Sequence, residues 1–270
     1  MHHHVLLVLV AIGLLSLVSQ WLAWRLRVPA ILFLLASGLL LGPTTGVLDP
    51  DAFFGDLLFP FVSLAVAVIL FEGSLTLSYE EIRGHGAVVR RLVTTGLFVT
   101  WLSVALFVWL IIGASWQLAL LFGSIMTVTG PTVIMPMIQA VRPNRSIANI
   151  LRWEGILVDP MGAMLAVLTF AVILAVQESS TGAGEVVLVL LRLIGAGVAV
   201  GAAAGYLWGL ALRSDLVPHF LQNVATLLVV FAVFALADSV ASESGLLAVT
   251  IMGVWLSNTR GLHIEGILDF

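Results

Sequence analysis

The chain has 270 residues, of which 61% are hydrophobic and only 10% are charged, and its mean hydropathy is +1.16. Soluble domains carry roughly 25% charged residues, so this composition indicates an integral membrane protein. The absence of cysteine excludes disulfides, thiol nucleophiles and cysteine metal sites, and a net charge of -4 argues against a nucleic-acid partner, which needs clustered basic charge.

Apolar stretches recur along the whole chain. A helix needs about 20 apolar residues to cross a bilayer. We therefore predict an all-α polytopic membrane protein with about nine transmembrane helices, near residues 5–24, 28–48, 57–78, 88–113, 116–140, 152–177, 185–212, 218–237 and 244–258.

The charges between these spans predict the orientation of the chain. Arginines follow the first, third, fifth, seventh and ninth spans, whereas the alternate connections carry acidic residues or no charge; Arg192 is the exception, near a helix end where it can snorkel. Because cytoplasmic loops are rich in basic residues, we predict the N-terminus outside and the C-terminus in the cytoplasm. The arginines behind this assignment are Arg25, Arg27, Arg83, Arg90, Arg91, Arg142, Arg145, Arg152, Arg213 and Arg260.

Three ionisable residues lie well inside predicted spans, where such groups are rare and are candidates for function. Glu72 lies in the third span, and Glu154 and Asp159 lie in the sixth. Asp159 is near the midplane, and Glu154 is closer to the cytoplasmic side on a different helix face. The alternative is a structural ion pair, which we favour for Glu154 because Arg152 lies at a similar depth.

The fifth span contains the sequence SIMTVTGPTVIMPMIQ, with Gly130 and Pro131 at its middle. Proline removes a backbone donor and clashes one turn back, so we predict an unwound helix near Thr129–Pro131, with freed carbonyls from Thr127 to Thr129. Such backbone is tolerated at membrane depth only where it is buried or lines a hydrated cavity. The alternative is a simple proline kink whose loose carbonyls are capped by threonine hydroxyls.

Asp159 and this unwound stretch lie at matching depth in consecutive spans. A carboxylate, threonine oxygens and bare carbonyls form a hard oxygen cage that suits a small alkali cation. Burial favours the neutral form of an unpartnered carboxyl group, whereas a bound cation favours its charged form. We therefore predict that a cation and a proton compete at Asp159.

Two segments 215 positions apart are weakly similar, PAILFLLASGLLLGPTTG from position 29 and SGLLAVTIMGVWLSNTRG from position 244. Five identities in so biased a composition also fit chance, but the predicted topology gives the two segments the opposite orientations that inverted transporter repeats require. We therefore divide one transmembrane domain, 1–270, into a first repeat at 1–178, a linker helix at 185–213 and the start of a second repeat at 218–270. Within the linker helix, GVAVGAAAGYLWG places small residues at fourfold spacing, which predicts a tight helix-packing seam.

The segments VPAILFLLASGLLLGP, LFEGSLTL, TGPTVI, WEGILVDP and SGLLAVTIMGVWLSN occur in the order found in the monovalent cation/proton antiporter superfamily, and the chain resembles its sodium/hydrogen exchanger type. The resemblance implies alternating access, an unwound TGP helix, and ion and proton binding at Asp159. It further implies an ion ligand at Thr129, a neighbouring carboxylate at Glu72, and a structural Glu154 paired with an arginine of a later helix. Thr127, Gly130 and Pro131 would support the site.

The chain departs from the family pattern at several positions. Gly130 stands where Asp is commonest, Val158 where Asn is commonest, and Gly155 where Ser is frequent. These changes remove oxygen ligands, which leaves the choice between Na+ and K+ open. Family members typically have about 12 or 13 spans, so the chain matches the N-terminal part of the membrane domain and is expected to be C-terminally incomplete.

The resemblance also implies a homodimer in the cell membrane, with monovalent cations and protons as substrates and no cofactor. One midplane aspartate is typical of one-for-one exchange in this family. A non-transporting scaffold or sensor derived from an antiporter is the main alternative. An intramembrane aspartyl hydrolase would need two facing aspartates, whereas Asp238 lies toward the outer surface and only Asp159 is at midplane depth.

Overall fold

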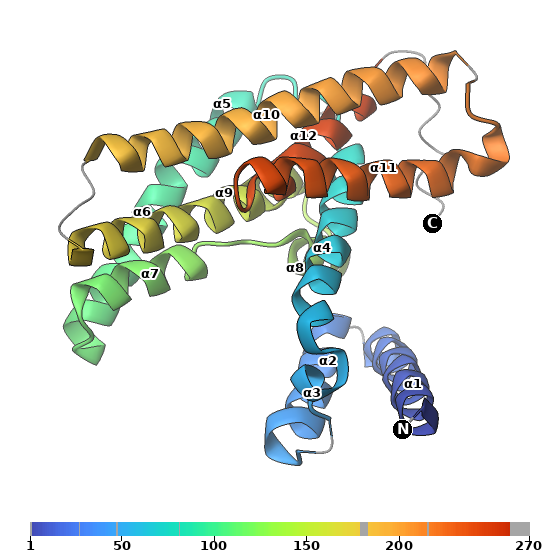
Figure 1. Cartoon of the computed structure of the whole chain (residues 1–270), viewed down its shortest axis with the longest axis horizontal. Coiled ribbons are helices and arrows are strands. Elements are labelled where there is room, and N and C mark those ends of the chain that lie inside the picture. The colour runs from blue at the N-terminus through green and yellow to red at the C-terminus, as the bar shows by residue number, and fades with distance from the viewer. Residues whose placement is uncertain are drawn as a thin grey trace. The chain divides into compact units, whose positions relative to one another are not determined.

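The computed structural model describes residues 2–26, 28–46, 48–80, 82–178, 183–214 and 216–259, and Figure 1 shows their helices. These residues form helices and turns without a β-strand, as predicted. The helices are α1 His2–Leu26, α2 Ala30–Leu39, α3 Pro50–Phe54, α4 Leu58–Leu75, α5 Gly86–Arg91, α6 Leu97–Phe107, α7 Trp116–Met126, α8 Pro131–Val141, α9 Arg145–Glu178, α10 Ala183–Arg213, α11 His219–Val240 and α12 Ser244–Ser257. The π-helical segments Leu40–Thr44, Leu92–Gly96 and Val108–Ile112 continue α2, α5 and α6, and a 3-10 turn at Gly55–Leu57 precedes α4.

Six of the described helical segments are long and apolar enough to cross a membrane: Val8–Leu26, Gly55–Leu75, Gly86–Ile112, Arg145–Phe170, Leu188–Arg213 and His219–Val240. Three shorter apolar helices, Ala30–Thr44, Trp116–Met126 and Ser244–Ser257, fall within three further predicted spans. Their length alone does not reach the roughly 20 residues that a crossing needs. The expected number of nine crossings therefore stays a prediction.

The chain forms two compact units in its described part. One contains the residues up to Ser63 together with Thr132–Pro143, and in it α1 packs against α2. The other contains Leu64–Pro131 and the residues from Asn144 onward, and it holds the predicted ion-binding residues. Arg27, Arg260 and the remainder of the predicted second repeat after 259 lie outside the described residues.

The first unit shows how threonines compensate for a proline at the end of a span. Pro43 lacks the N–H that would bond the carbonyl of Leu39 in a helix. The hydroxyl of Thr44 donates to that carbonyl at 2.9 Å and to the carbonyl of Leu40 at 2.7 Å. The hydroxyl of Thr45 also donates to the carbonyl of Leu40, at 2.7 Å. Two threonine hydroxyls thus bond the carbonyls that precede Pro43, in a segment whose backbone is π-helical.

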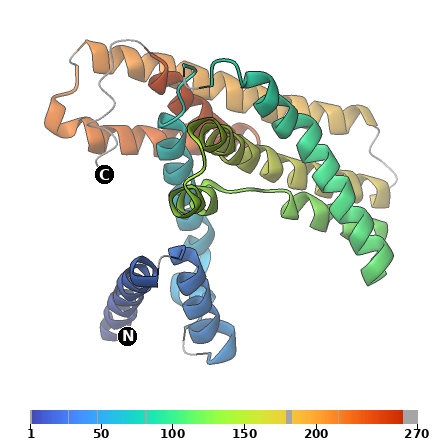
Figure 2. The same ribbon diagram turned by 180° about the vertical axis from the view of Figure 1, so that it is seen from behind.

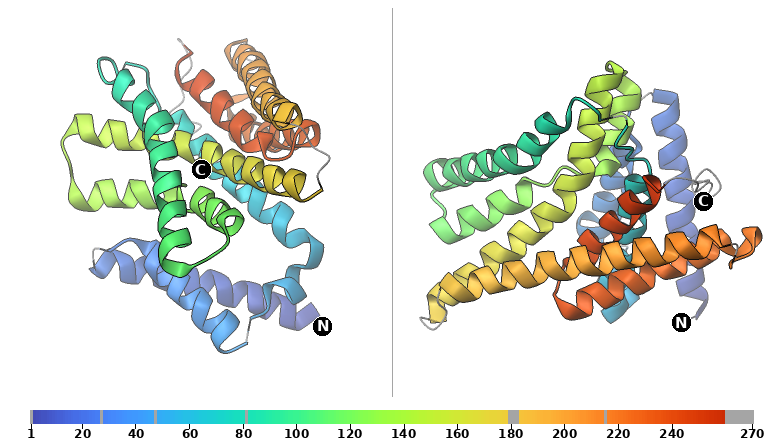
Figure 3. Two further views of the ribbon diagram at one scale, coloured as in Figure 1. Left: turned by 90° about the vertical axis from the view of Figure 1, so that its left-hand side faces the viewer. Right: turned by 90° about the horizontal axis from the view of Figure 1, so that it is seen from above.

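The predicted glycine seam of α10 is confirmed, and its partner is α12. A Cβ added to Gly201 would overlap the backbone of Ala248, and one added to Gly205 would lie 2.8 Å from the Cβ of Trp255. Gly197 meets the side chain of Leu247 in the same way. Figure 3 shows α12 lying against α10 in two views. The glycines therefore let the two helix backbones approach closely.

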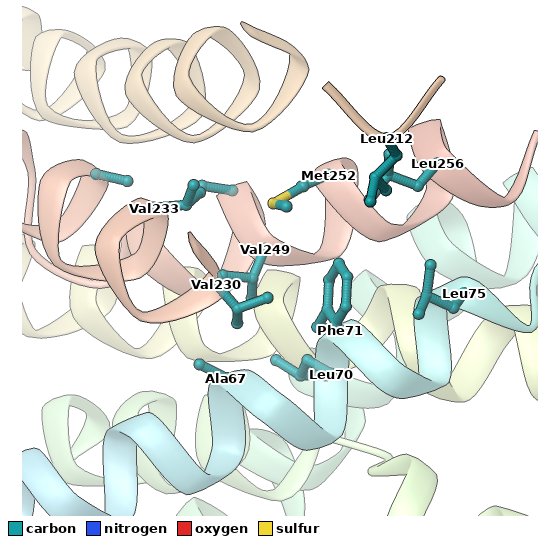
Figure 4. Packing of buried hydrophobic residues seen from close by; sticks show 12 residues of the cluster. Ala67, Leu70, Phe71, Leu75, Leu212, Val230, Val233, Val249, Met252 and Leu256 are labelled. Carbon is teal, nitrogen blue, oxygen red and sulfur yellow. The ribbon is translucent and has the colours of Figure 1, made fainter. Parts of the chain in front are cut away.

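A hydrophobic cluster joins α4 to this pair of helices and to α11. Gly253 of α12 lies so close to Ser74 of α4 that an added Cβ would overlap the serine side chain. Ser74 turns its hydroxyl to the carbonyl of Phe71 at 2.7 Å and is fully buried. Figure 4 shows the apolar side chains around this crossing, which are Ala67, Leu70, Phe71, Leu75, Leu212, Val230, Val233, Val249, Met252 and Leu256.

The C-terminal end of α12 also holds the connection that follows α4. The Ser257 hydroxyl and the Asn258 amide donate to the carbonyl of Leu77 at 2.7 and 2.9 Å. The side-chain oxygen of Asn258 accepts the backbone N–H of Tyr79 at 2.8 Å. The ring of Tyr79 lies 5.6 Å from that of Trp153 in α9, measured between centroids. This connection is therefore fixed by residues far away in the sequence.

The turn between α11 and α12 contains a pair of acidic residues. The backbone N–H of Glu243 donates to the carboxylate of Asp238 at 2.6 Å, and Glu243 itself has a positive φ of 69°. Partial burial, and secondarily the negative charge of Asp238, raise the pKa of the Glu243 carboxyl group. The Ser244 hydroxyl closes the turn by donating to the carbonyl of Ala237 at 2.7 Å.

The α10–α12 seam can be tested by adding one methyl group. We expect Gly201→Ala to lower the free energy of unfolding by about 1–3 kcal/mol, because the new Cβ must push the α12 backbone away. Gly195→Ala in the same helix is the matched control, since its Cβ would meet no atom within 4 Å. Thermal unfolding of both purified variants in detergent measures the difference. Equal melting temperatures would contradict the close packing.

The Glu243 turn predicts a pH-dependent stability. A carboxyl group whose pKa is raised by folding binds its proton more tightly in the folded state, so its destabilising effect grows as the pH rises through that pKa. Glu243→Gln keeps the backbone bond to Asp238 but removes the charge. We expect the variant to melt above the parent at about pH 8 and to lose this advantage toward about pH 5. Exposed Glu80→Gln is the control, and a pH-independent difference for Glu243→Gln would refute the assignment.

Candidate functional site

Helix α7 is held against α6 up to the point where it ends. The indole N–H of Trp101 in α6 donates to the carbonyl of Leu120 at 2.8 Å. Gly123 lies so close to α6 that an added Cβ would be 2.8 Å from the carbonyl oxygen of Trp101 and 3.1 Å from the backbone nitrogen of Ala105. Since neither helix can slide without breaking these contacts, the end of α7 has a defined position.

After Met126 the backbone leaves helical geometry and does not return to it until Pro131. Two long bonds of 3.4 Å, from the backbone N–H of Thr127 to Ser124 and from that of Val128 to Ile125, close the last turn. The buried Thr127 also donates its hydroxyl to the carbonyl of Gly123 at 2.7 Å. Figure 2 shows the chain running on from α7 without helical turns. The carbonyls of Gly123, Ser124 and Ile125 thus accept bonds at the end of α7, whereas the carbonyls after them lie beyond the regular pattern of that helix.

Helix α9 contacts this non-helical stretch at two points. The hydroxyl of Thr129 donates to Oε1 of Glu154 at 2.9 Å, and both side chains are partly buried. Val128 lies against Gly162, where an added Cβ would overlap the valine side chain and lie 3.5 Å from its Cα. Two consecutive residues of the stretch are thus attached to α9 at positions eight residues apart.

Asp159 lies between these two points along α9. It is partly buried, and no hydrogen bond or ion pair joins its carboxyl group to another described residue. The next residue, Pro160, is buried within the helix and cannot donate to the carbonyl of Ile156. A carboxyl group without a protein partner and a carbonyl without its helix donor therefore occur within one turn.

The other side of this part of α9 is apolar. Val158 is 2% exposed and packs in a hydrophobic cluster with Leu77, Val93, Leu97 and Ile156. Val158 therefore contributes packing and no oxygen ligand. This arrangement leaves the partly buried Asp159 at the edge of an apolar face.

The structure brings together some of the predicted site residues. Thr129 and Glu154 are hydrogen-bonded, and Asp159 lies on the same helix as Glu154. Glu72 is exposed on α4 and forms no hydrogen bond with these residues. Among the described residues no group of three or more His, Cys, Asp or Glu side chains could hold a metal ion. A cation at this place would thus depend on hydroxyl and backbone oxygens as well as on Asp159.

Two contacts that hold the site and its surroundings together were not predicted from the sequence. The contact of Val128 with Gly162 follows from the packing of two separate segments, and the only sequence signal is a small residue one turn after an aspartate inside a span. Similarly, Ser257 and Asn258 bond the carbonyl of Leu77 across the fold, although the sequence places them at the end of an apolar helix.

Comparisons with known proteins agree with this architecture. Residues 11–267 match the family model described as "Sodium/hydrogen exchanger, transmembrane". The chain is 29% identical over 260 residues to the K(+)/H(+) antiporter NhaP of Alkalimonas amylolytica, covering 94% of this chain and 44% of that protein. It is 25% identical to the Na(+)/H(+) antiporter 1 of Methanocaldococcus jannaschii, covering 92% of this chain and 58% of that protein. The chain thus spans about half the length of these relatives.

The solved structures give the same result for the fold. The sodium proton antiporter MjNhaP1 of M. jannaschii at pH 8 superimposes with a TM-score of 0.75 at 23% sequence identity, over 94% of this chain and 62% of that one. A likeness at this identity establishes the fold alone, whereas the family match extends over nearly the whole chain. The predicted resemblance is therefore confirmed, and the chain belongs to the transmembrane sodium/hydrogen exchanger family.

Proposed function

We propose that this protein exchanges a monovalent cation, Na+ or K+, for H+ across the cell membrane by alternating access, with cation and proton competing at Asp159. The observation that supports this most directly is the placement of Asp159. Its carboxyl group has no partner among the described residues, and Asp159 lies in an apolar, membrane-length helix, between the two positions along that helix that contact a non-helical stretch.

The chemistry of competition follows from the charge of one group. In a medium of low dielectric constant, an isolated carboxylate is unfavourable and is neutralised by taking up a proton. A bound alkali cation removes the same penalty by pairing with the carboxylate. Both partners therefore stabilise Asp159, but they do so in exclusive states, so that loading one releases the other.

The remaining oxygen ligands would come from the stretch after α7. Thr129 carries a hydroxyl next to carbonyls that have left the helix, and oxygen donors of this kind suit alkali cations. In this proposal Thr129 contacts the ion while Glu154 accepts its hydroxyl proton and orients it. Thr127, Gly130 and Pro131 maintain the break, and Glu72 supplies negative charge near the path of the ion.

The family supplies the wider setting of the proposal. The break between α7 and α8 is interpreted as one discontinuous crossing within nine, and the chain as a first inverted repeat with the start of a second. The proposal also includes a homodimer in which the N-terminus of each chain lies outside the cell. The relatives named as K(+)/H(+) and Na(+)/H(+) antiporters support cation exchange but leave both cations as candidates.

Exchange can be measured in proteoliposomes that contain a pH-sensitive dye. Sodium or potassium loaded inside should drive proton entry and acidify the lumen. We expect Asp159→Asn to reduce this flux to that of protein-free liposomes, because an amide neither binds a proton nor carries the charge that holds a cation. Exposed Asp56→Asn is the matched control and should keep full flux, and Glu72→Gln should show a partial loss. Cation-driven flux in Asp159→Asn would refute the proposed site.

Thr129 allows a sharper test of the oxygen ligands. Thr129→Val keeps the side-chain shape but removes the hydroxyl that donates to Glu154. We expect the half-saturating cation concentration to rise about tenfold or more, as the loss of a hydrogen bond to a charged group suggests. Thr129→Ser keeps the hydroxyl and should stay within about threefold of the parent. Equal half-saturation in the valine and serine variants would exclude the hydroxyl from the ion site.

The main alternative is a non-transporting scaffold or sensor. It is favoured by Val158, which is packed in the apolar cluster and offers no oxygen ligand where antiporters of this type commonly have one. A parent protein that leaves the luminal pH unchanged under both sodium and potassium gradients would support this alternative over exchange.

A further inference from the structure

The contact between Val128 and Gly162 fixes the distance between the non-helical stretch after α7 and helix α9, which are separate segments of the chain. Gly162 is buried, and a Cβ at this position would overlap Cγ2 of Val128 and lie 3.4 Å from its Cβ. The Cα of Val128 is only 3.5 Å from the same point, so the backbone of the stretch itself approaches α9. Only a residue without a side chain leaves room for this approach.

The position of Gly162 relative to Asp159 gives the contact its significance. With a rise of 1.5 Å and a rotation of 100° per residue, Gly162 lies about 4.5 Å along the axis from Asp159 and about 60° around it. Glu154, which accepts the Thr129 hydroxyl, lies about 7.5 Å from Asp159 in the opposite direction along the axis. Along the axis, Asp159 therefore lies between the steric contact and the hydrogen bond; around the axis it is about 60° from Gly162 and about 140° from Glu154.

We propose that Gly162 is a positioning residue for the ion site, and that the Val128 side chain seated on it sets how closely the carbonyls of the non-helical stretch approach Asp159. This inference rests on the proposed cation/proton exchange. Thr129 is bonded to Glu154 and the adjacent Val128 rests on Gly162, so the middle of the stretch is held to two positions of α9 without any bond to Asp159. The carboxyl group stays available to the ion, while the oxygen atoms opposite it keep their distance.

The chemistry of valine makes this contact stiff. The χ1 angle of a β-branched side chain is restricted, so Cγ2 cannot easily rotate away from an added methyl group. Gly162→Ala must therefore displace the backbone of the stretch. Displacements of about 1 Å in a preorganised site can reduce activity about 100-fold.

The test compares Gly162→Ala, Val128→Ala and the double variant in the proteoliposome assay. We expect Gly162→Ala to raise the half-saturating cation concentration about tenfold or more. In the double variant, the smaller alanine side chain that replaces Val128 makes room for the new methyl group, and half-saturation should return to within about threefold of the parent. Gly195→Ala in α10, whose Cβ would meet no atom within 4 Å, is the matched control and should behave as the parent.

The pH profile separates positioning from folding. If cation and proton compete one for one, a tenfold weaker cation site is displaced at a tenfold lower proton concentration, so the profile of Gly162→Ala should move about one pH unit toward alkaline values. A variant that is only less stable would lose protein from the membrane, or maximal rate, at unchanged half-saturation and unchanged pH profile. That outcome, or a double variant no better than Gly162→Ala, would overturn the positioning role.

Two of the variants already named keep the positioning role testable if Gly162→Ala fails to fold. If Gly162→Ala does not accumulate in the membrane, Val128→Ala carries the test, because it loosens the same contact without adding atoms. Half-saturation should then rise about two- to threefold, and an unchanged value would overturn the inference. Exchange by the parent together with its loss in Asp159→Asn establishes the proposed function separately, so failure of the positioning role and failure of exchange are distinguished.

Discussion

A backbone that leaves helical geometry within a bilayer must find its hydrogen-bond partners inside the protein. In the stretch from Thr127 to Gly130, the backbone N–H groups of Thr127 and Val128 bond back to α7, and side-chain contacts hold the stretch to α7 and α9. Everything proposed for Asp159 depends on this attachment, because a carboxyl group can select between a cation and a proton only if the oxygen atoms facing it are held in place. The close packing of α7 on α6 fixes the helix end from which the stretch begins.

Much of this architecture is encoded locally and could be predicted. Apolar runs of membrane length predict the helices, and Gly130 followed by Pro131 interrupts the apolar pattern between α7 and α8. The small residues of α10 predict a seam because their fourfold spacing places them on one helix face. Asp159 is conspicuous because an ionisable group within such a span is energetically costly and therefore rare, which makes it a candidate for function. In each case the signal lies within one short stretch of the sequence.

The features that could not be predicted depend on which side chains meet across the fold. The expectation for Glu154 rested on the nearby Arg152 and stays a prediction, but the bond that Glu154 accepts from Thr129 comes from another segment and could not be foreseen. Glu72 is an acidic residue within a predicted span, as expected of a site residue, but its side chain is exposed on α4. Gly162 carries no side chain, so the sequence alone does not reveal its contact. The contact is seen only in the structure, where the side chain of Val128 occupies the space that a Cβ of residue 162 would need.

The bonds from Ser257 and Asn258 to the carbonyl of Leu77 have a consequence for how the protein is made. They join residues 180 and 181 positions apart, so the connection after α4 cannot complete them until the ribosome has added α12 and that helix has entered the membrane. Contacts of such long sequence separation form late, because the loop must close before they are gained. During translation the segment that contains Leu77 and Tyr79 is therefore made well before the residues that hold it in the folded protein.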